Sequence, residues 1–149
     1  PLTGYLMDKL LRKEPVVLYN NTDIKRDYIH VKDIFEIVLK MLELRSMKGE
    51  KYETFNLCSG NSYSVPQIVR ILEDVCGDKL EINFGKPVEI WSRHSAIFDK
   101  ISHGRVEREV FKESIGSNKK LVEYLGIDFQ FIDMRRGLKE MYKQGLREQ

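Results

Sequence analysis

The spacing of apolar residues divides the chain into helices that alternate with short strands. Apolar residues recur every three or four positions where an amphipathic helix is expected, and they alternate or run together where a strand is expected. Helices are predicted over about 2–11, 33–45, 64–76, 117–125 and 133–146, and strands over 16–19, 28–31, 54–58 and 80–84. This alternation predicts α/β packing. The strands are too few and too brief for a complete doubly wound sheet.

Two helices carry further local signals. Ser64 and Gln67 have the spacing of a capping box, in which a hydroxyl at the cap is followed three residues later by Gln. Gly77 is expected to end that helix. Asp33 is expected to cap the amino terminus of its own helix. The apolar face of the Asp33 helix is predicted to consist of Ile34, Phe35, Val38, Met41 and Leu42.

Composition narrows the class of protein. The 149 residues are 42% hydrophobic, and 25 basic residues against 23 acidic ones give a net charge of +2. This balance does not predict a nucleic-acid surface. No apolar run reaches the roughly 18 residues of a membrane span. Cys58 and Cys76 are too few for a disulfide framework, and no histidine has metal-ligand spacing. We therefore expect a cytoplasmic protein with no metal, membrane or nucleic-acid partner.

The segment from Arg26 to Asp33, Arg-Asp-Tyr-Ile-His-Val-Lys-Asp, carries the most distinctive candidate chemistry. It places a guanidinium at one end of a predicted buried strand and a carboxylate at the start of a helix. In one interpretation Arg26 and Asp27 form a surface ion pair, which contributes little. In the other, Arg26 is an anchored guanidinium that grips a phosphate through two hydrogen bonds. Physical reasoning alone favours neither.

This segment closely resembles the signature R-D-[YFW]-[IVL]-[HY]-V-x-D of the extended short-chain dehydrogenases, the NAD(P)-dependent nucleotide-sugar epimerases and dehydratases. Residues 55–65, which include Phe-Asn-Leu-Cys-Ser-Gly, are similar to a strand, loop and helix start of that family. Residues 117–126 and 137–138 are similar to its closing segments. Order and spacing agree over 1–84 and 114–146. The resemblance implies a Rossmann-type α/β fold with short strands and several helices.

The resemblance also implies site residues. Arg26 matches the arginine that binds the substrate diphosphate, and Tyr19 matches a residue that lies against the nucleotide base, although a strand-end core tyrosine is the alternative. Asn61 matches a loop asparagine that reaches the nucleotide or sugar, and a simple turn residue is nearly as well supported. Asp27 and Asp33 are interpreted as structural, the first as a local partner for the turn and the second as the helix cap.

The sequence departs from the family pattern after the last predicted strand. Family members place Arg-Pro-Gly-Asp or a close variant there, and its arginine contacts the diphosphate. Here Lys86-Pro87 is followed by an atypical segment, 85–113, in which Lys86 or Arg93 is a candidate for the second cation. Cys58 stands where glycine is usual. These differences indicate a divergent branch.

The cofactor half of the family pattern is missing from this sequence. It contains no glycine-rich dinucleotide loop, and the two Tyr-x-x-x-Lys matches, at Tyr5 and Tyr28, are interpreted as chance. Because the chain starts at Pro1, it is expected to be a carboxy-terminal, substrate-binding fragment, 1–149, inactive alone. The whole enzyme is expected to use NAD or NADP, to bind a nucleoside-diphosphate sugar and to be a homodimer. The alternative is a degenerate, non-catalytic binding or scaffold module.

Overall fold

The computed structural model describes residues 2–18, 23–48, 53–85, 113–126 and 129–147. Its helices are α1 (Leu2–Arg12), α2 (Val31–Lys48), α3 (Val65–Cys76), α7 (Lys119–Leu125) and α8 (Met134–Gly145). Its strands are β1 (Val16–Leu18), β2 (Arg26–Asp27), β3 (Ser62–Tyr63) and β4 (Ile82–Phe84). The prediction of an α/β fold with several helices and short strands is confirmed. No helix within these ranges is both long and apolar enough to cross a membrane.

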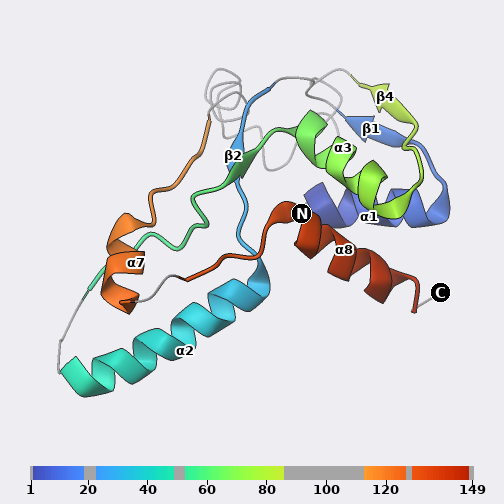
Figure 1. The fold of residues 1–149 in the computed structure, drawn as a ribbon. Helices are drawn as coiled ribbons and strands as arrows, with labels where there is room; N and C mark the ends of the chain where they lie inside the picture. Colours follow the sequence, from blue (N-terminus) through green and yellow to red (C-terminus); the bar gives the residue numbers. More distant parts are fainter. Residues whose placement is uncertain (1, 19–22, 49–52, 86–112, 127–128, 148–149) are drawn as a thin grey trace, which may run out of the picture.

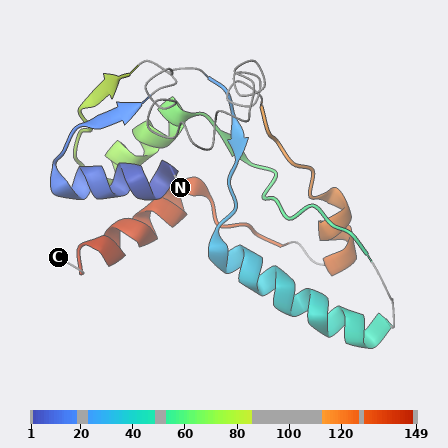
Figure 2. The ribbon, with the colours of Figure 1, turned by 180° about the vertical axis from the view of Figure 1, so that it is seen from behind.

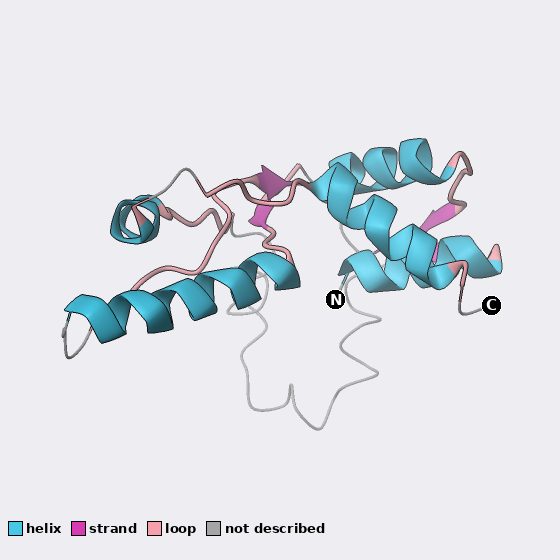
Figure 3. Cartoon of the chain, turned by 60° about the horizontal axis from the view of Figure 1, so that its bottom comes forward, coloured by secondary structure: helices cyan, strands magenta, loops and turns pink. Residues whose placement is uncertain are grey.

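The elements form two groups that β2 and β3 join. Helices α1, α3 and α8 lie together with β1 and β4, whereas α2 and α7 lie apart from them on the other side of the molecule (Figure 1). The view from behind shows the same division (Figure 2). In Figure 3 the β2–β3 pair lies between the two groups of helices. The chain therefore passes from one group to the other through the segment that begins at Arg26.

The larger hydrophobic core lies inside the first group. Its side chains come from one face each of α1, α3 and α8 and from the two parallel strands. The fully buried members are Leu6, Val16, Ile68, Leu72 and Leu138, each 2% exposed or less. A stripe of apolar residues at helical spacing must be buried against another element, and these three helices bury theirs against one another.

A smaller core lies between α2 and α7, and it corrects the predicted face of α2. Ile37 is fully buried against α7, whereas Phe35, Val38 and Leu42 are 64%, 44% and 59% exposed. The prediction of a buried face containing Phe35, Val38 and Leu42 was wrong. The reason is that α2 has apolar residues on opposite sides, so periodicity alone does not decide which side packs.

The strands differ from the predicted ones more than the helices do. β1 pairs in parallel with β4, with Val16 opposite Ile82, which agrees with two of the predicted strands. The predicted strand 28–31 is wrong, because the Ile34 N–H already donates to the His30 carbonyl oxygen at 3.2 Å and Val31 begins α2. The predicted strand 54–58 forms no ladder within the described ranges. A short apolar run is compatible with several backbone conformations, and neighbouring segments decide among them.

The capping signals of α3 are confirmed. The Gln67 N–H donates to Ser64 Oγ at 3.4 Å, and the Ser64 N–H donates to Gln67 Oε1 at 2.9 Å, which completes the capping box. Gly77 ends the helix with φ of 72°, a left-handed conformation that glycine adopts at little cost. Asp133 caps α8 in a similar way, since its carboxylate accepts the Arg136 N–H at 2.8 Å.

Candidate functional site

The β2–β3 pairing brings together two of the residues proposed from the sequence. Arg26 pairs with Tyr63 in antiparallel register, and the Tyr28 N–H donates to the Asn61 carbonyl oxygen at 3.3 Å. A third segment lies on the other edge of β2, where the Ser114 N–H donates to the carbonyl oxygen of residue 25 at 3.1 Å. Arg26 is half-buried and Asn61 is exposed. A guanidinium and an exposed asparagine therefore stand on adjacent, hydrogen-bonded segments.

The carboxylate of Asp27 binds the loop that carries Asn61. Its Oδ1 accepts the Ser59 N–H at 2.9 Å and the Ser59 hydroxyl at 3.1 Å, and its Oδ2 accepts the Gly60 N–H at 2.8 Å. The Ser59 Oγ accepts in turn from the Asn61 N–H at 3.0 Å. The interpretation of Asp27 as a local turn partner was wrong, because its partners Ser59 and Gly60 lie 32 and 33 residues from it in sequence.

The far side of this loop is also held. Asn118 donates from its side-chain amide to the Ser59 carbonyl oxygen at 2.9 Å, and Asn56 donates to the Ser117 carbonyl oxygen at 3.3 Å. Cys58, in the position where the family usually has glycine, is 8% exposed, and a side chain added at Gly116 would overlap its Sγ. The segment before Asn61 is thus packed on both sides.

Two pKa shifts describe the electrostatics around the site. Burial raises the pKa of the Tyr28 phenol, and the positive charge of Arg26 opposes that shift. Burial also raises the pKa of the Cys58 thiol, and the negative charge of Asp27 adds to it. Cys58 is consequently a neutral thiol at neutral pH and a poor nucleophile. The arrangement suits the binding of an anion by Arg26 better than covalent chemistry.

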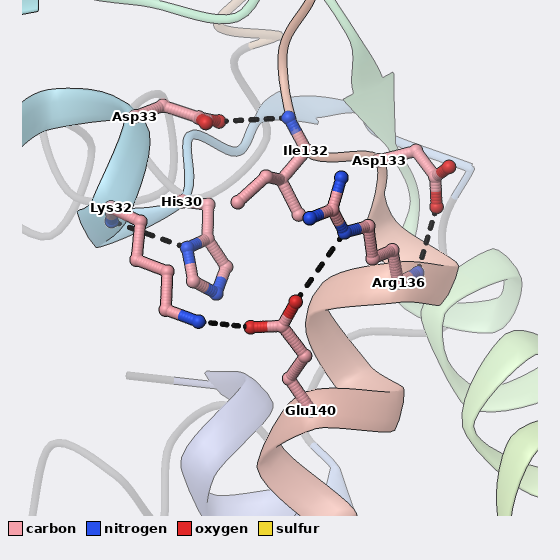
Figure 4. Close-up of polar contacts among 7 residues, drawn as sticks. All are labelled: His30, Lys32, Asp33, Ile132, Asp133, Arg136 and Glu140. Carbon is pink, nitrogen blue, oxygen red and sulfur yellow. Dashed lines mark hydrogen bonds and ion pairs between the residues drawn. The ribbon is translucent and has the colours of Figure 1, made fainter. Parts of the chain in front are cut away.

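The other end of the Arg26–Asp33 segment holds the start of α2 to the chain before α8 (Figure 4). Asp33 is 2% exposed, and its carboxylate accepts the Ile132 N–H at 2.9 Å. The Lys32 N–H donates to His30 Nδ1 at 3.2 Å, and Lys32 Nζ pairs with Glu140 at 2.5 Å. Asp33 lies in the first turn of α2 rather than before it, so its prediction as the helix cap was wrong.

Three of the residues predicted to bind the substrate, Tyr19, Lys86 and Arg93, lie outside the described ranges. Nearly all of the atypical segment 85–113 also lies outside them. Their roles remain predictions. Of the predicted substrate-binding residues, Arg26 and Asn61 lie within the described ranges, and their roles in binding also remain predictions.

The first Tyr-x-x-x-Lys match has partners of its own in the fold. The Tyr5 hydroxyl accepts the Val17 N–H at 3.1 Å, and Lys9 Nζ pairs with Glu14 at 2.5 Å. In the second match, Lys32 pairs with Glu140. These contacts attach α1 to β1 and α2 to α8. Among the described residues no group of three or more His, Cys, Asp or Glu side chains is arranged to hold a metal ion.

Within the described ranges, no glycine-rich loop of the kind that binds a dinucleotide pyrophosphate is present. Among the described residues, the glycines with positive φ are Gly60, Gly77 and Gly126, with φ of 75°, 72° and 68°. Gly77 and Gly126 lie at the carboxy-terminal ends of helices. A pyrophosphate-binding loop instead has clustered glycines at the amino-terminal start of a helix. The full sequence has no such cluster. We therefore assign to these residues no step that passes through a nicotinamide.

Sequence reasoning missed the part that Asp27, Ser59 and Asn118 play in building the site. The only available signal was chemical: Ser59 and Gly60 offer backbone N–H groups in a loop with no predicted ladder, and such groups need acceptors. The sequence does not indicate which of several carboxylates accepts hydrogen bonds from these N–H groups.

Comparison with known proteins finds matches in one protein family. Residues 2–58 match the model of the NAD dependent epimerase/dehydratase family. The GDP-6-deoxy-D-talose 4-dehydrogenase of Aggregatibacter actinomycetemcomitans is 31% identical over 147 residues, which cover 99% of this chain and 43% of that protein. The chain therefore spans about two-fifths of the length of this relative.

Solved structures share the fold. The UDP-glucose 4-epimerase of Thermotoga maritima, solved with UDP-glucose, matches with a TM-score of 0.70 at 22% identity. The match covers 98% of this chain and 40% of the epimerase chain. The UDP-glucuronic acid 4-epimerase of Bacillus cereus, in complex with NAD, matches with a TM-score of 0.69 at 18% identity. The match covers 98% of this chain and 39% of the epimerase chain. The family model and the aligned relative support membership of the NAD dependent epimerase/dehydratase family of extended short-chain dehydrogenases, and the solved structures show the same Rossmann-type α/β fold.

Proposed function

We propose that this chain binds the nucleoside diphosphate of a nucleotide sugar and positions the sugar for an NAD(P)-dependent reaction. The observation that carries the proposal is the β2–β3 pairing, which puts Arg26 and Asn61 on adjacent, hydrogen-bonded segments. A planar guanidinium binds phosphate oxygens through two parallel hydrogen bonds. Holding a substrate in the reactive geometry is itself a large part of catalysis.

The proposed division of labour follows from the residues present. Region 1–149 supplies substrate binding, and NAD or NADP is bound by residues outside this sequence, because no glycine-rich loop occurs in it. This chain by itself is then inactive. The NAD in the complex of the related epimerase supports the choice of a nicotinamide cofactor for the whole enzyme.

We further propose that the nucleotide is GDP. The relative that aligns with 99% of this chain acts, by its name, on a GDP-linked 6-deoxy sugar. In this proposal Tyr19 lies against the base, Asn61 reaches the nucleotide or sugar, and Lys86 or Arg93 supplies a second cation. A reaction at the sugar carbon that bears a hydroxyl or keto group is consistent with such a relative.

The experiment is calorimetric titration of the 149-residue chain with GDP, UDP and GMP. GDP is expected to bind most tightly, and Arg26→Ala to weaken it by the 1.5–3 kcal/mol that a charge-assisted hydrogen bond contributes, about 10- to 150-fold. Lys25→Ala is the matched control, since it removes the same charge from the adjacent residue. Absence of GDP and UDP binding, or equal losses in the two variants, would contradict the proposal.

A further inference from the structure

We infer that Asp27 is a positioning residue for the diphosphate site, one that fixes the loop of Asn61 relative to Arg26. The inference rests on the proposed function. Asp27 follows Arg26 directly in β2, so the guanidinium and the carboxylate share one short stretch of backbone. The carboxylate reaches across to Ser59 and Gly60, and the loop 59–61 is thereby attached to the strand that carries the cation.

The geometry is that of a complete clamp. Both oxygens of the Asp27 carboxylate are used, and they accept three hydrogen bonds of 2.8 to 3.1 Å. Ser59 is 5% exposed, so its two bonds to the carboxylate are part-buried, whereas the bond from the exposed Gly60 is open to solvent. A carboxylate that accepts several N–H and O–H donors holds them in one arrangement.

The clamp extends to both backbone groups of Asn61. Its N–H donates to the Ser59 hydroxyl oxygen, which itself donates to Asp27, and its carbonyl oxygen accepts from the Tyr28 N–H at 3.3 Å. The exposed Asn61 side chain therefore projects from a backbone that is fixed at both ends of the residue.

Gly60 explains why the loop can lie so close to the carboxylate. Its φ of 75° is left-handed, which turns its N–H toward Asp27 Oδ2, and a methyl group at this position would meet the Asn118 amide at 3.3 Å. The loop is thus confined between Asp27 on one side and Asn118 on the other. Sites held by such supporting bonds keep their geometry when a ligand enters.

Electrostatics and positioning make opposite predictions for Asp27→Asn. The carboxylate is a negative charge near the proposed place of a diphosphate, so its neutralisation alone would tighten the binding of an anion. Positioning predicts weaker binding, because the amide keeps one acceptor oxygen, and its NH₂ group cannot accept the Gly60 N–H. The sign of the change therefore separates the two effects.

The test measures nucleotide affinity and melting temperature for Asp27→Asn in the 149-residue chain, with GDP and UDP as probes. We expect the dissociation constant to rise about tenfold, and to rise at high salt as well as at low salt. Asp33→Asn is the matched control: it also neutralises a carboxylate that accepts a distant backbone N–H, but it lies away from the loop, and its affinity should stay within about twofold of wild type. In the double variant with Asn61→Ala, the combined loss should be smaller than the product of the two single losses.

The outcomes separate this inference from the function beneath it. Unchanged or tighter binding by Asp27→Asn, while Arg26→Ala still weakens binding at least tenfold, would overturn the positioning role and leave the proposed function standing. Equal weakening by Asp33→Asn would also overturn it, since a general loss of stability would then explain both. Failure of the wild-type chain to bind either nucleotide would overturn the proposed function and this inference together.

Discussion

Replacement of Asp33 by alanine should destabilise the protein strongly, because it leaves the part-buried Ile132 N–H without its acceptor. The Asp33 carboxylate is 2% exposed and accepts the Ile132 N–H at 2.9 Å across 99 residues of sequence. A hydrogen bond to a charged group contributes about 1.5–3 kcal/mol. The negative charge in the first turn of α2 adds about 0.3–1 kcal/mol through the helix dipole. The expected loss is therefore about 2–4 kcal/mol.

Urea unfolding followed by far-UV circular dichroism measures this loss, provided that the slope of free energy against urea stays the same. Glu36→Ala is the control, because Glu36 is an exposed carboxylate on the same helix and its loss should change stability by less than about 0.5 kcal/mol. Asp33→Asn keeps an acceptor oxygen and should lie between the two. A loss for Asp33→Ala no larger than that for Glu36→Ala would refute the reasoning.

Three further predictions concern capping, packing and pH. Ser64→Ala should cost about 1 kcal/mol and Ser64→Gly less, by the same unfolding assay, because the capping box is lost while glycine still suits the cap. Ile37→Ala should cost about 2–5 kcal/mol and Phe35→Ala under 0.5, since only Ile37 is buried; equal losses would show that the face is misassigned. The hydrogen bond from Lys32 lowers the pKa of the Glu140 carboxyl below its ordinary value. The stability from that carboxylate is present above about pH 4.3 and lost as pH falls through the lowered pKa, so the melting-temperature difference between wild type and Glu140→Gln should vanish in acid; a difference that persists there would exclude this linkage.

The helices of this fold were predictable because their signals are local. The hydroxyl of Ser64, the amide of Gln67 and the freedom of Gly77 act within one helix, and they predicted both ends of α3. Helix α2 shows where local reasoning stops. Its apolar residues lie on two sides, and Ile37 is the buried one only because α7 packs there. That choice depends on residues more than 80 positions away in the sequence.

The sequence named residues of the candidate site, whose binding roles remain predictions, but it did not predict how the site is built. Resemblance to the family supplied Arg26 and Asn61, but β2 and β3 have two residues each, too few for an alternating pattern to appear. A pairing between such strands is supported by side chains of the strands that reach other segments. Asp27 is one of these, and its sequence position beside an arginine suggested a surface ion pair instead.

The two carboxylates of the Arg26–Asp33 segment make the fold and the site inseparable in ordinary mutagenesis. Asp27 holds the loop 59–60, and Asp33 holds the chain at Ile132. Each carboxylate therefore accepts hydrogen bonds from backbone N–H groups that are distant from it in sequence. Loss of either one therefore lowers stability, and a loss of nucleotide binding alone does not reveal whether a residue contacts or positions the ligand. The two are chemically matched but differ in which segment they hold. Comparing them under one assay separates the geometry of the proposed diphosphate site from the stability of the chain that carries it.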